Sequence, residues 1–552
     1  MARLRPRRRR SPGIAVAIAA LLVAGAAPAA AIGVDVAPLS GLSTSESGGT
    51  ATFTVVLASP PAADVIIPVA TSDPSEGTVN VSSLTFTAAD WDVPQTVTVT
   101  GVDDAVQDGD KPYNVLLGAA TSDDVDYSGY DPADVAVTNT DNDAVGIQVT
   151  PTSGLVTSEA GGTATFDVVL NSQPTADVTL PVGSSDAGEG TPSASSLKFT
   201  AADWNVPQTV TVHGVDDAVD DGDQGYTITL GAATSSDPNY DGVDATDVSV
   251  TNTDDDVAGV QVTPTSGLVT TESGGTASFT IVLRSQPTAN VTIPVASSDA
   301  TEGSVSASSV TFTSANWNVP QSITVTGADD FVADGDIAYS VTLGKATSSD
   351  ALYAAIDPAD VAVTNTDNDV AGIQVTPTSG LVTTEAGGQA TFTVVLNSQP
   401  LANVSIPVSS SDVSEGTVST SNLTFTAANW NVPQTVTVTG VDDAVQDGNV
   451  AYSIVLGLAV SVDVRYTGMN PADAGASNTD NDAAGIAVTP TSGLFTTEAG
   501  GTATFNVVLQ SQPTANVVIP VASTDVTEGT VSASSLTFTP ANWNTPRTIT
   551  VT

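Results

Sequence analysis

The sequence has no cysteine and only one histidine, and half of its twelve basic residues lie within the first ten positions. Without cysteine, disulfides and thiolate metal sites are excluded. With His213 alone, neither a Ser–His–Asp nor a Cys–His arrangement can recur along 552 residues. After residue 31 the chain carries six basic against 61 acidic residues, a formal charge of −55. Such a surface repels nucleic acid and anionic membranes and attracts cations.

A long apolar run is present only near the N-terminus. Residues 3–10 are basic, residues 13–26 are apolar, and residues 27–31 are small, as at a signal-peptide cleavage site. This pattern predicts a signal peptide over residues 1–31, and a retained membrane anchor is the alternative. The arginines leave general and twin-arginine export both open. We therefore expect a mature chain without a membrane span, secreted or held at a bacterial cell surface.

The rest of the chain repeats every 113 residues. The five tryptophans, Trp91, Trp204, Trp317, Trp430 and Trp543, keep this spacing, and all ten glutamates fall at two positions of the same frame. A repeat of this kind predicts tandem copies of one module. The predicted repeats span residues 32–143, 144–256, 257–369, 370–482 and 483–552. The fifth copy stops before its acidic stretch, so we expect either a fragment of a longer protein or a poorly folded tail.

Each repeat is predicted to be all-β. In repeat 2, residues 145–151, 163–170, 176–182, 196–200, 208–214, 225–231 and 247–252 alternate apolar residues with threonine or serine. Turn-rich segments separate them, and no window has helical periodicity. About seven short strands in roughly 110 residues are typical of an immunoglobulin-like antiparallel β-sandwich. In this arrangement Trp204 is expected to be a packing residue and His213 a strand substitution.

Acidic residues recur at four places that such a sandwich brings together. In repeat 1 these are Glu46 between the first two strands, Glu76 in the third loop, the segment GVDDAVQDGD (101–110), and NTDND (139–143) after the last strand. Because successive strands alternate in direction, all four are predicted to meet at one end of the module. Bare carboxylates ~4 Å apart repel by roughly 4 kcal/mol per pair at an effective dielectric near 20. A bound cation would reverse that cost, whereas a generally acidic, solvated surface is the simpler alternative.

The chemistry of the acidic segments favours calcium. The donors are all oxygens, which makes Zn²⁺ an unsuitable ion, and many flexible carboxylates suit the 6–8 ligands of Ca²⁺ better than the strict octahedron of Mg²⁺. The spacing matches neither an EF-hand loop nor a glycine-rich nonapeptide repeat. Paired carboxylates also serve glycosidases, but no set of aromatic residues accompanies them here. We therefore expect no enzymatic activity.

These motifs, in this order, resemble the Calx-beta domain family. Its pattern has a glutamate before the second strand, an acid ten residues before a phenylalanine, an Asp–Asp pair with another acid four residues on, and a closing acidic triplet. The closing triplet is DND in repeats 1, 3 and 4 and DDD at 254–256, and repeat 4 has DGN at 447–449. The resemblance implies immunoglobulin-like sandwiches, of which several bind Ca²⁺ at one tip. The metal ligands predicted from these positions are Glu46, Glu76, Asp103, Asp104, Asp108, Asp141, Asp143, Glu159, Glu189, Asp216, Asp217, Asp221, Asp254, Asp256, Glu272, Glu302, Asp329, Asp330, Asp334, Asp367, Asp369, Glu385, Glu415, Asp442, Asp443, Asp447, Asp480 and Asp482.

The preferred hypothesis is an exported structural or adhesive protein whose modules bind Ca²⁺ at the inter-repeat tips, which stabilises each module and stiffens a rod. Almost no linker separates NTDND from the next repeat, so each tip is expected to adjoin the following module. Two alternatives stay open: accessory repeats of a larger exported enzyme, or a calcium-buffering protein. The partners expected are calcium ions and other cell-surface or matrix molecules. Repeat 5 is expected to lack a complete metal site.

Overall fold

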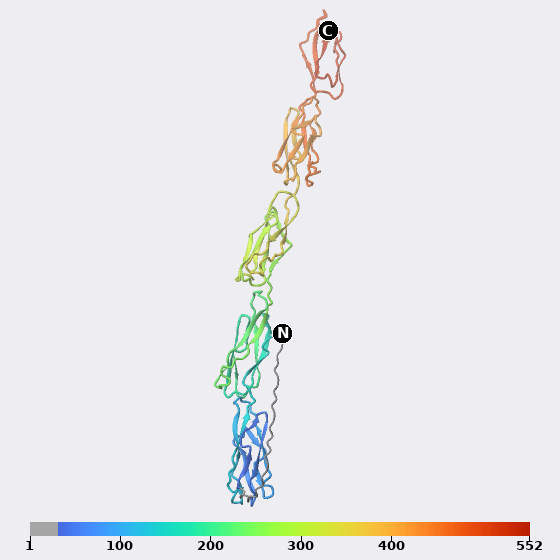
Figure 1. Ribbon diagram of the computed structural model, residues 1–552. Coiled ribbons are helices and arrows are strands. Elements are labelled where there is room, and N and C mark those ends of the chain that lie inside the picture. Colours follow the sequence, from blue (N-terminus) through green and yellow to red (C-terminus); the bar gives the residue numbers. More distant parts are fainter. Residues whose placement is uncertain (1–30) are drawn as a thin grey trace, which may run out of the picture. The chain divides into compact units, whose positions relative to one another are not determined.

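The structure is a computed structural model that describes residues 31–552, so the predicted signal peptide lies almost wholly outside the described residues. The described residues form strands and no helix, and none of them belongs to a helix with the length and apolar character of a membrane span. The chain divides into two compact units, residues 31–255 and 256–552, which are described separately below. In Figure 1 the strands of each repeat are gathered into a sandwich of its own.

Repeat 1 consists of two facing sheets. The first has the order β1–β3–β7–β5 and the second the order β2–β10–β8–β4–β6, with β9 pairing at β4. The bounds are β1 (Val34–Ala37), β2 (Leu42–Ser45), β3 (Thr50–Leu57), β4 (Val65–Thr71), β5 (Gly77–Val79), β6 (Ser83–Phe86), β7 (Gln95–Gly101), β8 (Lys111–Leu117), β9 (Thr121–Ser122) and β10 (Val135–Thr140).

Repeat 2, in the same unit, has the same topology. Its strands are β11 (Ile147–Thr150), β12 (Leu155–Ser158), β13 (Thr163–Leu170), β14 (Val178–Ser184), β15 (Gly190–Pro192), β16 (Ser196–Phe199), β17 (Gln208–Gly214), β18 (Gln224–Leu230), β19 (Thr234–Ser235) and β20 (Val248–Thr253).

In the second unit, repeats 3 and 4 keep this order, with a single β-bridge in each, Thr292–Thr347 and Ser405–Val460, in place of β9. Repeat 3 comprises β21 (Val260–Thr263), β22 (Leu268–Thr271), β23 (Thr276–Leu283), β24 (Val291–Ser297), β25 (Gly303–Val305), β26 (Ser309–Phe312), β27 (Gln321–Gly327), β28 (Ile337–Leu343) and β29 (Val361–Thr366). Repeat 4 comprises β30 (Ile373–Thr376), β31 (Leu381–Thr384), β32 (Gln389–Leu396), β33 (Val404–Ser410), β34 (Gly416–Val418), β35 (Asn422–Phe425), β36 (Gln434–Gly440), β37 (Val450–Leu456) and β38 (Ala474–Thr479).

The described part of repeat 5 has a three-stranded sheet, β39–β40–β43, and a two-stranded sheet, β41–β42. Their bounds are β39 (Ile486–Thr489), β40 (Ala503–Leu509), β41 (Val517–Pro520), β42 (Ser535–Phe538) and β43 (Arg547–Val551). The described strands of this repeat include no counterparts of β8 and β10 to cover its core. As a result Phe505 is only partly buried, whereas its counterpart Phe53 is 1% exposed.

The core of each repeat follows from the period-two pattern of its strands. Along β3, Phe53, Val55 and Leu57 point inward and are at most 2% exposed, while the residues between them face outward. Burying each such side chain stabilises the fold by about 1.5–3 kcal/mol. Trp204 packs, partly buried, against the core of repeat 2, as predicted. The all-β sandwich fold predicted from the alternation is confirmed, with all seven predicted strands of repeat 2 present.

The structure adds short strands that alternation over so few residues does not reveal. The stretch after the first strand forms β2, which joins the second sheet and pairs in parallel with β10. A further short strand, β5, precedes the strand expected after the third loop: β5 pairs with β7 in one sheet, and the expected strand, β6, pairs with β4 in the other. The sandwich is therefore antiparallel except at the β2–β10 edge, and that edge positions the acidic loops.

Candidate metal centre

The β2–β10 pair brings two distant acidic segments together at one end of repeat 1. Parallel neighbours end on the same side, and the last residues of β2 and β10, Ser45 and Thr140, are paired. The Glu46 backbone N–H extends this pairing by donating to the carbonyl oxygen of Thr140 at 3.2 Å. Glu46 and Asp141 therefore follow directly from adjacent strand ends, although 95 positions separate them in the sequence.

A first carboxylate cluster forms at this edge. One carboxylate oxygen each from Glu46, Asp141 and Asp143 lie within 4.8 Å of one another. Backbone amides orient two of these groups, because Asn142 N–H donates to Glu46 Oε2 at 3.1 Å and Gly109 N–H donates to Asp141 Oδ2 at 2.7 Å. Asp143 Oδ2 is buried and has no hydrogen-bond partner within residues 31–552. A buried carboxylate oxygen without a donor is a position that a cation would satisfy.

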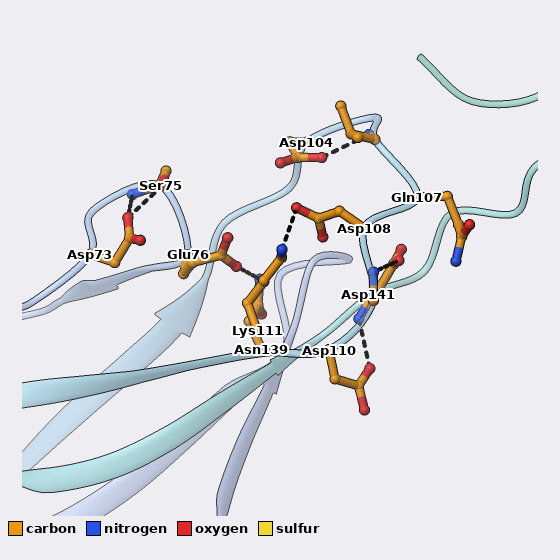
Figure 2. A network of polar contacts seen from close by, with 12 residues as sticks. Asp73, Ser75, Glu76, Asp104, Gln107, Asp108, Asp110, Lys111, Asn139 and Asp141 are labelled. Atoms are coloured by element: carbon orange, nitrogen blue, oxygen red, sulfur yellow. Dashed lines mark hydrogen bonds and ion pairs between the residues drawn. The ribbon is translucent and has the colours of Figure 1, made fainter. Parts of the chain in front are cut away.

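A second carboxylate cluster is formed by the third loop and the loop with the Asp–Asp pair, as repeat 2 shows. There Glu189, Asp217 and Asp221 bring one oxygen each within 4.8 Å of one another. The counterparts in repeat 1 are Glu76, Asp104 and Asp108, which Figure 2 shows gathered at the tip. In repeat 1, Glu76 directly precedes β5, and Asp104 and Asp108 lie in the loop that follows β7. The strands β5 and β7 are paired neighbours in the first sheet.

Buried polar groups below the tip hold the second cluster in place. Asn139 Nδ2 donates to Glu76 Oε2 at 3.3 Å and to the Val102 carbonyl at 3.0 Å, and Asn139 Oδ1 accepts from Thr44 Oγ1 at 3.0 Å. Thr44 Oγ1 is in turn 3.2 Å from the Tyr113 hydroxyl. The same contacts recur around Asn252, Asn365 and Asn478. Glutamate at this position is thus anchored from inside the core in repeats 1–4.

Burial and like charges act together on the tip glutamates. Glu46 is 2% exposed, and burial first, then the charges of Asp141, Asp104 and Asp143, raises its pKa to about 7 against the lowering effect of the Asn142 amide. The pKa values of Glu159 and Glu272 are likewise raised to about 7, with burial as the first cause. Without a counter-ion, therefore, ionising these groups at neutral pH opposes folding.

The other predicted ligands of repeats 3 and 4 occupy equivalent places. Glu272, Asp367 and Asp369 form the first cluster of repeat 3. In repeat 4, the Asn481 amide donates to Glu385 Oε2 at 2.9 Å. Burial is the first cause that raises the pKa of Glu302 and Glu415. Like charges also raise both pKa values: those of Asp334 and Asp330 act on Glu302, and those of Asp447 and Asp443 act on Glu415. Further orphaned carboxylate oxygens among the described residues belong to Asp334, Asp369 and Asp482.

The middle residue of the closing triplet differs between repeats, and with it one candidate ligand of each tip. Where that residue is asparagine, its Nδ2 donates to the first aspartate of the Asp–Asp pair, with distances of 3.1 Å to Asp103 and 3.2 Å to both Asp329 and Asp442. In repeat 2 it is Asp255, which clusters with Glu159 and Asp216. Asp255 was not among the predicted ligands, although the DDD spelling is a visible signal for it.

The remaining residues singled out in the sequence include further acids of the tips, the glutamates of repeat 5 and the single histidine. Gly222 N–H and Gly448 N–H donate to Asp254 and Asp480, each at 2.7 Å, as Gly109 does to Asp141. Asp256 is the first residue of the second unit. Glu498 and Glu528 of repeat 5 are exposed, whereas their counterparts in repeats 1–4 are buried, apart from Glu189, which is partly buried. His213 is exposed on β17, where it pairs with Thr163.

Within each unit, the loop that bears the Asp–Asp pair also touches the next repeat. In the first unit, Gln173 N–H donates to the Ala105 carbonyl at 2.5 Å, and Asn239 Nδ2 donates to the Gln107 carbonyl at 2.6 Å. In the second unit, Gln399 N–H donates to the Phe331 carbonyl at 2.6 Å and Gln512 N–H to the Ala444 carbonyl at 2.5 Å. Ala105, Phe331 and Ala444 each directly follow the Asp–Asp pair of their loop.

The fold and its acidic tips define a protein of tandem β-sandwich modules. The family model of the Calx-beta domain matches residues 32–143, 139–256, 252–369 and 365–482. The chain therefore belongs to the Calx-beta domain family. No curated protein sequence matches the chain.

Among solved structures, the chain is similar to CBD12 from CALX1.2, at 17% identity and a TM-score of 0.20, over 37% of this chain and 81% of that one. The calcium binding domain CBD12 of CALX1.1 matches at 15% identity and a TM-score of 0.21, over 37% and 81%. Domains 1–6 of the surface layer protein SbsC match at 15% identity and a TM-score of 0.18, over 94% and 62%.

Proposed function

We propose that repeats 1–4 are Ca²⁺-binding modules of an exported, non-enzymatic structural or adhesive protein. The observation that carries the proposal is the first cluster of repeat 1, where a 2%-exposed glutamate meets two aspartates and one buried carboxylate oxygen has no donor. Isolated buried charges of one sign are costly, and a divalent cation both neutralises them and satisfies the orphaned oxygen. Membership of the Calx-beta family supports the same conclusion.

The donor set favours Ca²⁺ over other ions. The two clusters offer carboxylate oxygens from four separate loops, and Ca²⁺ accepts 6–8 oxygen ligands in irregular geometry. Mg²⁺ requires a near-ideal octahedron, and Zn²⁺ prefers nitrogen and sulfur ligands. Glu46, Asp141 and Asp143 would hold an ion in the first cluster of repeat 1, while Glu76, Asp104 and Asp108 would contribute to the second.

A junction role for the ion rests on the loop that follows β7 and its equivalents. This loop carries three of the predicted ligands and also accepts the hydrogen bond from the next repeat within each unit. An ion that fixes the loop would therefore reduce the freedom of that contact. We infer that Ca²⁺ stabilises each module and stiffens the connection to the following one.

Calorimetric titration of the full chain with Ca²⁺ tests the binding. Asp104→Asn combined with Asp217→Asn should remove or weaken binding in two repeats. The matched control is Asp90→Asn with Asp203→Asn. Each of these aspartates accepts a hydrogen bond from a threonine hydroxyl in a loop outside the clusters. Asparagine makes the same contact in repeats 3 and 4, as Asn316 and Asn429. Equal loss in both double variants, or no saturable heat in the wild type, would contradict the proposal.

Solution scattering and thermal unfolding test the structural role. With Ca²⁺ the full chain should melt at a higher temperature and show a larger maximum dimension than with a chelator. If neither quantity changes on chelation, the stiffening role is wrong. Export is tested separately by the mass of the protein recovered outside the producing cell, which should lack residues 1–31.

A further inference from the structure

In repeat 1 a basic residue contacts the second cluster from the strand that follows the acidic loop. Lys111, the first residue of β8, places its Nζ 3.0 Å from Asp108 Oδ2. Figure 2 shows this side chain reaching into the second cluster beside Glu76. The position is taken by Gln224, Ile337 and Val450 in repeats 2, 3 and 4. The acids of the second cluster, Glu76, Asp104 and Asp108, have acidic counterparts in repeats 2–4, so these repeats show the same cluster without a lysine at this position.

The lysine contacts Asp108 and is also subject to the charges of the other two acids of the second cluster. The pKa of Lys111 is raised first by its hydrogen bond and charge interaction with Asp108, and then by the charges of Glu76 and Asp104. These three acids are the counterparts of Glu189, Asp217 and Asp221, whose oxygens lie within 4.8 Å of one another in repeat 2. In that repeat the neutral Gln224 turns aside, with its Nε2 donating to the Asp221 backbone carbonyl at 2.9 Å.

An ammonium group and a calcium ion compete for the same oxygens. A carboxylate oxygen that is 3.0 Å from Nζ already has a charge-assisted hydrogen bond, and a divalent ion bound to it would lie within a few ångströms of a like charge. That repulsion is twice the repulsion between two unit charges at the same distance. In the first cluster, by contrast, Glu46 and Asp141 accept hydrogen bonds from the backbone amides of Asn142 and Gly109, which carry no net charge.

We propose that Lys111 acts as a built-in cation in the second cluster, so that repeat 1 binds one calcium ion fewer than repeat 2. This inference rests on the proposed calcium binding. Lys111 would be a specificity-determining residue: it neutralises part of the tip permanently and leaves only the Glu46 cluster open to the metal. Repeat 1 would thus keep part of its tip organised where calcium is scarce, whereas repeat 2 would not.

Equilibrium dialysis of the full chain against ⁴⁵Ca²⁺ tests the inference by stoichiometry at saturation. Lys111→Gln, which copies repeat 2, should gain one ion per chain, and Gln224→Lys should lose one. Lys198→Gln is the matched control, because Lys198 is an exposed residue of β16 that pairs with Asp177, outside the clusters, and its removal changes the net charge equally. It should leave the stoichiometry unchanged.

The outcomes separate the two levels of the argument. Wild-type stoichiometry in Lys111→Gln, with saturable binding present, overturns the role of Lys111 and leaves the proposed function standing. Equal gains in Lys111→Gln and Lys198→Gln also overturn it, since they would show an effect of net charge alone. Absence of saturable binding in every form, wild type included, refutes the proposed function itself. Gln224→Lys tests the same exclusion in a separate repeat if Lys111→Gln disturbs folding, which circular dichroism would show.

Discussion

Replacing Glu46 with glutamine should change the stability of repeat 1 in opposite directions with and without calcium. In the metal-free chain the ionised carboxylate is buried beside Asp141 and Asp143. Glutamine removes that charge, and its carbonyl oxygen can still accept the Asn142 N–H. With calcium bound, the same substitution removes a charged ligand and should weaken the site.

The size of the metal-free effect follows from the pKa of Glu46. A rise from 4.5 to about 7 corresponds to about 3 kcal/mol of unfavourable ionisation at pH 8, at about 1.4 kcal/mol per pKa unit. Because the folded state holds its proton more tightly than the unfolded state, this cost is absent below pH 4.5 and grows as pH rises to 7. Glu46→Gln should therefore stabilise metal-free repeat 1 by up to about 3 kcal/mol at pH 8 and by much less at pH 5.

Hydrogen exchange measured by mass spectrometry can isolate one repeat, because the peptide covering β3 differs in sequence from its counterparts. In chelator at pH 8, exchange of β3 amides should slow by up to roughly 150-fold in the variant, and in saturating calcium it should accelerate. Glu498→Gln in repeat 5 is the matched control, since Glu498 is exposed, and it should change neither. A destabilisation of equal size in both conditions would refute the reasoning, because it would make Glu46 an ordinary structural residue.

Three further predictions follow. In chelator the melting temperature of the full chain, measured by calorimetry, should fall as pH rises from 5 to 8, because three glutamates with a pKa near 7 bind protons more tightly in the folded than in the unfolded chain. Saturating calcium should abolish that fall. Gly77→Ala should destabilise repeat 1 by about 2 kcal/mol or more in denaturant titrations, because a Cβ there would overlap the Tyr113 ring, whereas Gly33→Ala, whose Cβ would meet Tyr130 at 3.6 Å, should have little effect. Phe331→Ala should increase hydrogen exchange of the Gln399 amide, because the ring centroids of Phe331 and Trp430 lie 5.8 Å apart across the contact between repeats 3 and 4. Unchanged exchange would show that this ring contact does not stabilise the junction.

The long strands could be predicted from the sequence because each carries its own burial signal. In β13 and β17 inward residues alternate with threonine over seven or eight positions, and that pattern arises from one buried face. The strands β12 and β15 have four and three residues, and they exist because neighbouring strands offer unpaired backbone groups. Tertiary context of this kind leaves no local periodicity to detect.

The candidate site was predictable to the same extent. Loop positions follow from alternating strand directions, so Glu46 and Asp141 could be placed at one tip from the sequence. The anchoring role of Asn139 could not, because it depends on the depth at which one side chain of a strand end is buried. Nor could the contact of Lys111 with Asp108, since a lysine that begins a strand is usually solvated.

Repeat 5 indicates why the acidic tip and the complete sandwich depend on each other. Glu498 and Glu528 keep their positions in the frame, yet both are exposed, because the described strands of this repeat include no counterparts of β8 and β10. In repeat 1 those two strands supply Tyr113 and Asn139, which enclose and anchor Glu76, and β10 ends where Asp141 meets Glu46. The closure that completes the core therefore also buries the charges. A cation at the tip would thus be linked to the docking of these strands, so that calcium affinity and module stability should change together in any variant that loosens β10.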